Sequence, residues 1–145
     1  MKKKIIYQTI ILIVFTICFI MILGCGEKKE MKPDCVISNS FNDDYFLTII
    51  ANREIIEDKE MFAKQLIEQV CNNDFKSIMF SFEETGYPTG LSMHVYLTES
   101  DWEDRSKEPY MEISFRQENS VNGYNIVENY DEFKMEVNVD RMETL

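Results

Sequence analysis

The sequence predicts an α+β domain in which one helix packs on a four- to five-stranded antiparallel sheet. Three observations support this fold class. The segment 57–73 has apolar residues at helical spacing. Several shorter segments alternate apolar and polar residues, as half-buried strands do. Aromatic residues make up 12% of the chain, which favours a packed core over disorder. The predicted element order is β-α-β-β-β-β.

The first predicted strand, 44–51, is rich in β-branched and aromatic residues on both of its faces. This composition indicates a strand that lies inside the sheet or is covered on both sides. The predicted helix follows, with Asp58 as a suitable N-cap and acidic residues in its first turn. It ends at Asn72 and Asn73, because asparagine tolerates the left-handed backbone of a helix C-terminus.

The rest of the chain supplies the other strands. Ser100–Glu103 has the spacing of a capping box and predicts a short helical turn. Asn122-Gly123 is the signal of a tight hairpin. Four segments alternate cleanly enough to be predicted as strands: 77–83, 91–98, 110–117 and 133–139.

The predicted element order resembles that of cystatin-like domains. The resemblance covers the order of elements only, and it implies one helix laid on an antiparallel sheet. The glutamine-valine-glycine loop with which cystatins inhibit proteases is missing from this sequence. The inhibitor function of that family is therefore not implied.

The N-terminal segment has the features of an export signal. Lys2, Lys3 and Lys4 precede an apolar run of 19 residues, 5–23. As a helix this run would extend about 28 Å, which is close to the hydrocarbon thickness of a bilayer. The lysines favour the cytoplasmic side of the membrane, so we expect the chain after this run to be exported.

The residues Ile22-Leu23-Gly24-Cys25 resemble the lipobox of bacterial lipoproteins. Ile22, Gly24 and Cys25 match that pattern, and Leu23 is bulkier than the small residue usual at its position. The resemblance implies that the Cys25 sulfur receives diacylglyceryl and that a type II signal peptidase cleaves after Gly24. The alternative is an uncleaved signal anchor with Cys25 as an incidental thiol. Both alternatives place the following domain outside the cytoplasmic membrane.

The expected organisation is therefore a signal peptide at 1–24, a lipidated N-terminus and polar tether at 25–43, and one extracytoplasmic domain at 44–145. The chain carries a net charge of −11, and removal of the three N-terminal lysines makes the remainder more acidic still. Such a surface repels phosphate backbones, which argues against nucleic acid as a partner. We expect the lipid anchor to bind the membrane. We expect the domain to have an unidentified protein or small-molecule partner, and a cationic partner is one alternative because the domain is acidic.

No pattern in the sequence predicts a catalytic site, a metal site or a cofactor. The one histidine, His94, falls on the outward face of a predicted strand, and no cysteine spacing resembles a zinc site. The acidic stretches 42–44 and 99–104 lack the alternating ligands and the glycine of a calcium loop. We therefore predict that the protein is not an enzyme.

Two further features remain open. Cys35 and Cys71 would both be exported, where a disulfide could join them, and a buried free thiol at Cys71 is the alternative. The outward positions of the later strands mix aromatic and charged residues, which is typical both of binding faces and of ordinary solvated surface. The candidate binding residues on that face are His94, Tyr96, Glu112, Arg116 and Lys134.

The sequence thus leaves two classes of function. We predict a membrane-anchored extracytoplasmic lipoprotein whose domain is a binding or interaction module. The alternative is an enzyme or protease-inhibitor-like domain of the envelope, which would require converging carboxylates in a cleft or a protruding loop.

Overall fold

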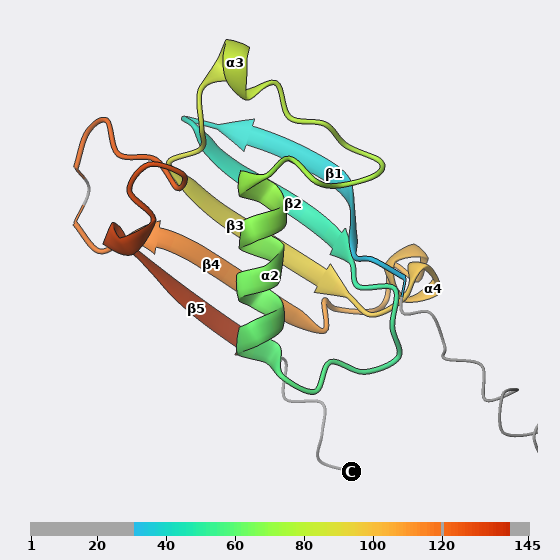
Figure 1. Ribbon diagram of the computed structural model, residues 1–145. Coiled ribbons are helices and arrows are strands. Elements are labelled where there is room, and N and C mark those ends of the chain that lie inside the picture. Colours follow the sequence, from blue (N-terminus) through green and yellow to red (C-terminus); the bar gives the residue numbers. More distant parts are fainter. Residues whose placement is uncertain (1–30, 120, 140–145) are drawn as a thin grey trace, which may run out of the picture. The chain divides into compact units, whose positions relative to one another are not determined.

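The computed structural model describes residues 31–119 and 121–139. These residues belong to one compact unit that begins at Met31, and Cys25 with the predicted signal peptide lies outside the described residues. The unit is a five-stranded sheet with one long helix, α2 (Lys59–Cys71), lying across one face (Figure 1). The α+β class is confirmed in this coarse form.

The strands lie side by side in the order in which they occur in the sequence. Neighbouring strands are antiparallel except for the second and third, which are parallel. The remaining elements are β1 (Asp34–Phe41), β2 (Asp44–Ile50), α3 (Phe82–Thr85), β3 (Gly90–Tyr96), α4 (Glu99–Glu103), β4 (Met111–Gln117), the 3-10 turn η1 (Tyr130–Glu132) and β5 (Phe133–Val139).

The prediction of a wholly antiparallel sheet is wrong, because β2 and β3 are parallel. Helix α2 carries the chain from the end of β2 back to the start of β3, as a crossover between parallel strands must. The error came from the predicted strand 77–83. A strand at that place would have reversed the direction of every later strand.

The segment 77–83 is a loop that ends in the short helix α3. The side-chain amide of Asn73 takes the place of a partner strand here. Its Nδ2 donates to the Phe80 carbonyl (2.8 Å), and its Oδ1 accepts from the Phe80 backbone N–H (2.7 Å). The Phe80 ring packs against Tyr45 and Phe82, with ring centroids 5.4 and 5.3 Å away. The alternating apolar residues of this segment therefore reach the core without forming a strand.

The predicted tether also contains a strand that the sequence analysis missed. Residues 34–41 form β1, an edge strand paired with β2. Asn42 (φ 50°) and Asp43 (φ 64°) connect the two strands, and left-handed backbone at both positions is typical of a type I′ turn. The observed order therefore begins β-β-α, which differs from the element order that resembled cystatin-like domains.

Asp34 fastens the start of β1 to the loop after α2. Its carboxylate accepts hydrogen bonds from the backbone N–H groups of Lys76 and Ser77 (3.0 Å each) and from the Ser77 hydroxyl (2.6 Å). Burial raises the pKa of Asp34, but these hydrogen bonds outweigh burial and leave the pKa below its ordinary value of 3.8. The tether prediction is therefore wrong from Asp34 onward.

Other predicted elements are confirmed. The strands β2, β4 and β5 fall within the predicted 44–51, 110–117 and 133–139, and β3 begins one residue before the predicted 91–98. Helix α2 begins after Asp58, whose Oδ1 accepts from the Met61 N–H (2.9 Å). The capping box of α4 lies two residues earlier than predicted, on Thr98 and Asp101. The turn at Asn122-Gly123 is part of a long β4–β5 connection, 118–132, so the predicted tight hairpin is wrong.

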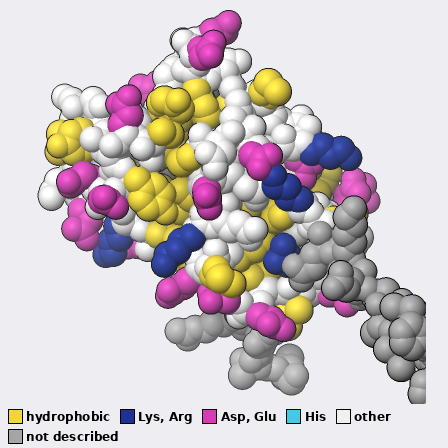
Figure 2. Space-filling view, in the orientation of Figure 1, with side chains coloured by type: hydrophobic (Ala, Val, Ile, Leu, Met, Phe, Trp, Pro, Cys, Tyr) yellow, Lys and Arg dark blue, Asp and Glu magenta, His cyan; other side chains and the backbone are white. Residues whose placement is uncertain are grey.

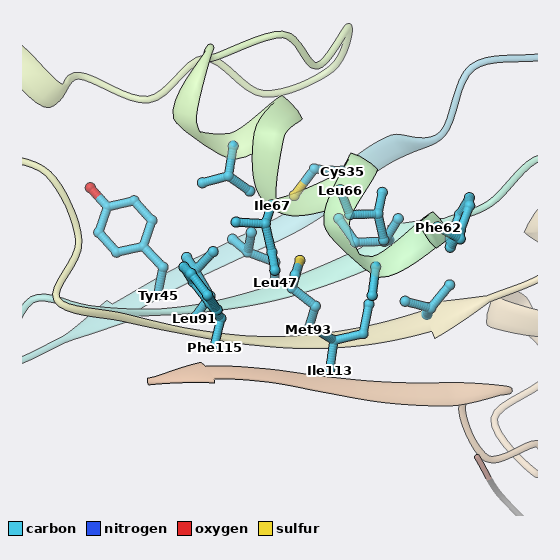
Figure 3. Packing of buried hydrophobic residues seen from close by; sticks show 14 of the residues in the cluster. Cys35, Tyr45, Leu47, Phe62, Leu66, Ile67, Leu91, Met93, Ile113 and Phe115 are labelled. Carbon is cyan, nitrogen blue, oxygen red and sulfur yellow. The ribbon is translucent and has the colours of Figure 1, made fainter. Parts of the chain in front are cut away.

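The core lies between α2 and the sheet. Leu66 and Ile67 of the helix face Leu47, Leu91, Met93, Ile113 and Phe115 of the strands (Figure 3). The inward residues predicted for β3, Leu91, Met93 and Val95, are fully buried. One face of the sheet is thus used for packing against α2, and the opposite face is not covered by that helix.

Candidate functional site

The sheet face opposite α2 is called the open face here. The strand register assigns to it every second residue of each strand, in rows that cross the sheet. All five candidate binding residues, His94, Tyr96, Glu112, Arg116 and Lys134, belong to this face. Their role in binding remains a prediction.

Arg116 forms an ion pair that crosses one whole strand. Asp44, Gly90 and Arg116 occupy the same row on β2, β3 and β4. The Arg116 Nη1 donates to the Asp44 carboxylate above the backbone of Gly90, and the Nη2 donates to Ser92 Oγ (3.1 Å). The other oxygen of Asp44 accepts from the Thr89 hydroxyl (3.3 Å). The pair therefore links β2 to β4 over the middle strand.

Gly90 makes this crossing possible. A Cβ atom at this position would lie 2.5 Å from Asp44 Oδ1 and 3.4 Å from Arg116 Nη1. A glycine inside a strand commonly marks such a close approach. The sequence predicts Asp44 only as part of a strand and of an acidic stretch, and it predicts neither Asp44 nor Gly90 as a member of the site.

The other charged groups of the open face form exposed pairs. His94 Nε2 lies 3.4 Å from Glu112 Oε1 across β3 and β4, and Lys134 Nζ lies 3.6 Å from Glu136 Oε1. These four side chains are all more than half exposed. Exposed pairs stabilise a fold by only about 0–1 kcal/mol, so a partner could replace either interaction at small cost.

An apolar cluster lies on the β1 side of the open face, next to Asp44 and His94. Phe46 of β2 lies opposite Asn39, and Ile37 and Phe41 are its diagonal neighbours on β1. The three apolar side chains are 41%, 39% and 70% exposed, in the order Phe46, Ile37, Phe41. Clustered exposed apolar residues are typical of interaction sites, whereas scattered ones are ordinary.

Two shallow hollows flank Arg116 and Gln117. One, of about 430 Å³, is bounded by the β1–β2 turn at Asn42 and Asp43 and by the β4–β5 connection at Asn122. The other, of about 350 Å³, lies between Arg116 and Lys134 on the open face. Both are lined mainly by polar groups. The arrangement offers hydrogen-bonding groups and charges of both signs to a bound surface.

Cys35 and Cys71 are free thiols in the structure. Cys35 is buried beneath α2, and burial, with a smaller contribution from Asp34, raises its pKa to about 12. Cys71 is half-buried at the end of α2, and burial raises its pKa to about 11. Both thiols therefore stay protonated and weakly reactive at neutral pH.

The acidic stretches considered for calcium are engaged in local structure. The Asp101 carboxylate accepts from the Thr98 backbone N–H and hydroxyl, and the Asp104 carboxylate accepts from the Ser106 hydroxyl (2.7 Å). Among the described residues, no three His, Cys, Asp or Glu side chains are grouped so that they could hold a metal ion. Among the same residues, no helix has both the length and the apolar character needed to cross a membrane.

No protein-family model, no curated protein and no solved structure matches this chain. Its function must therefore be argued from its own residues.

Proposed function

We propose that this chain is a lipid-anchored protein of the extracytoplasmic side of the membrane, and that its domain is a binding module that uses the open face of the sheet. The anchor rests on the sequence before Met31, where a lysine-rich start, an apolar run and the Ile22–Cys25 motif occur in the order of a lipoprotein signal. The binding role rests on the open face.

The observation that carries the binding role is the apolar cluster Ile37, Phe41 and Phe46 beside the Asp44–Arg116 and His94–Glu112 pairs. Contact between water and the exposed surface of three clustered apolar side chains is unfavourable. A partner that covers these side chains removes their surface from water, which stabilises the complex, and the neighbouring charges define the partner's orientation.

The start of β1 follows the proposed anchor closely. Asp34 lies nine positions after Cys25, with eight residues between them, so a fully extended chain from one to the other spans about 30 Å at most. A module on so short a tether samples partners near the membrane rather than in free solution. We therefore expect its partner to be a membrane-associated or cell-surface molecule.

The anchor is tested by intact-mass analysis and membrane fractionation of the wild type and of Cys25→Ala in a Gram-positive host. We expect the wild type to lose residues 1–24, gain a diacylglyceryl group and sediment with membranes. The variant should keep its N-terminus and lack the lipid. If both proteins keep the full N-terminus, Cys25 is incidental and the segment is a signal anchor.

The binding face is tested by placing a photoreactive benzophenone residue at Phe46 in the anchored protein. Irradiation of intact cells should give a discrete cross-linked adduct from this position. The matched control is the same residue at Met79, which is 84% exposed on the 74–81 loop. Adducts from neither site, or equal adducts from both, would show that the open face has no dedicated partner.

A further inference from the structure

A second surface lies on the helix-bearing side, where the β4–β5 connection packs beside α2 (Figure 1). A groove of about 310 Å³ runs between them. Its floor is apolar, because Ile126 is fully buried, and its walls include Val127 and Tyr130, which are 36% and 41% exposed. The six lining residues are Lys64, Glu68, Cys71, Ile126, Val127 and Tyr130.

The groove is held in shape by interactions within the connection. The Tyr130 ring packs on Phe115 of the core, with ring centroids 4.9 Å apart. Asn125 Oδ1 accepts from the backbone N–H groups of Val127 (3.0 Å) and Glu128 (2.9 Å). The Ile126 N–H donates to the Pro88 carbonyl (3.0 Å). A ligand would therefore meet a formed groove and would not have to order it.

Acidic residues outnumber basic ones in the segments that form this groove. Glu68 lies on its wall, Glu128, Asp131 and Glu132 belong to the segment that builds it, and Lys64 is the one basic residue among the lining residues. Burial is the largest cause that raises the pKa of Tyr130, and Cys71 and the carboxylates of Glu68 and Asp131 raise it further. Figure 2 shows hydrophobic side chains on this side of the molecule, with acidic and basic side chains around them.

We propose that this groove docks a partner segment that presents one aliphatic side chain between lysine or arginine residues. The apolar floor takes the aliphatic side chain, and the acidic rim binds the flanking cations. The inference goes beyond the proposed function, because it adds a separate surface on the opposite side of the sheet from the open face. Charge complementarity selects the occupant, since a second copy of this acidic chain would bring like charges to the rim.

The probe is a fluorescent peptide with one leucine flanked on both sides by lysines, and its control has glycine in place of the leucine. Fluorescence anisotropy with the full chain in a neutral detergent gives both affinities. We expect the leucine peptide to bind about tenfold more tightly, because burial of a leucine side chain stabilises a complex. Added salt should weaken both peptides.

Three variants locate the site. Val127→Ser should remove most of the difference between the two peptides. Glu68→Gln should weaken both peptides about two- to fivefold, as expected for one exposed charge. The matched control Glu60→Gln lies at the exposed start of the same helix and should change neither affinity. Thermal unfolding of each variant checks that the fold is retained.

Cysteine labelling gives a second readout. Cys71 lines the groove and Cys35 is fully buried, so the leucine peptide should slow alkylation of Cys71. The proposal is overturned if both peptides bind equally, if neither binds, or if Val127→Ser leaves the leucine preference intact. It is also overturned if Glu112→Gln on the open face weakens the peptides as much as Glu68→Gln does.

Discussion

Because the Asp44–Arg116 ion pair crosses over β3 at Gly90, we expect Gly90→Ala to destabilise the native chain but to stabilise a variant that lacks the Asp44 carboxylate. In the native chain, Gly90→Ala places a methyl group 2.5 Å from Asp44 Oδ1 and 3.3 Å from its Cγ. The carboxylate must move away from Arg116 and from the Thr89 hydroxyl. Overpacking of this kind costs about 1–3 kcal/mol, and the better strand propensity of alanine returns about 0.5–1 kcal/mol. We expect a net loss of about 1–2 kcal/mol.

In the Asp44→Ala background the obstacle is gone. Gly90→Ala should then stabilise the domain by up to about 0.5–1 kcal/mol, because alanine restricts the unfolded chain more than glycine does. The coupling energy of the double-mutant cycle is therefore about 2 kcal/mol. Urea unfolding of the unit 31–145, followed by the fluorescence of Trp102 and by circular dichroism, measures all four variants. An equal cost of Gly90→Ala in both backgrounds would refute the geometry of the crossing.

Three further predictions concern the loop after α2 and the thiols. Asn73→Ala should destabilise the domain by about 1–2 kcal/mol, since it removes both hydrogen bonds to Phe80 and a residue suited to φ 53°. Asn73→Gly should lose only the stability that the two hydrogen bonds supply, because glycine tolerates the left-handed backbone. An equal loss of stability in Asn73→Ala and Asn73→Gly would show that the backbone conformation contributes nothing. The pKa of Asp34 is lowered by folding, so its ionised form adds stability above about pH 4 that is lost as pH falls through the folded pKa. The stability gap between wild type and Asp34→Asn should therefore be constant near neutrality and close in acid, and a gap independent of pH would refute the assignment. In native protein Cys71 should react with iodoacetamide slowly at pH 8 and Cys35 more slowly still, and both should react fully in urea. Mass spectrometry that finds neither thiol alkylated after unfolding would instead show a disulfide.

The elements predicted correctly are those in which apolar residues recur with the period of a strand or of a helix. Leu91, Met93 and Val95 alternate because β3 buries one face, and the helix stripe of α2 faces the same core. Such local patterns are readable without knowledge of neighbours. The segment 77–83 shows their limit. Its apolar residues alternate, but the Phe80 backbone bonds to the Asn73 amide and the Ser77 N–H to the Asp34 carboxylate, and neither bonds to the backbone of a neighbouring strand.

The errors in topology and in the site have a common cause, which is contact between residues distant in sequence. β1 has weak alternation, and its strand character comes from pairing with β2 through the Asn42-Asp43 turn. Asp44 and Arg116 lie 72 positions apart, and only the parallel pairing of β2 with β3 brings them together. Alternation did predict that His94, Glu112 and Arg116 face outward, because that property depends on each strand alone.

The position of β1 determines how the domain responds to force. A pull from the chain before Met31 enters the domain at the start of β1. When it is directed along the strand, it loads the hydrogen bonds between β1 and β2 together, in shear, and does not open them one at a time. The three hydrogen bonds from Lys76 and Ser77 to Asp34 hold the loaded end to the loop after α2. A domain that is tethered at this point and held by a partner at its open face would therefore resist extension through its whole first strand.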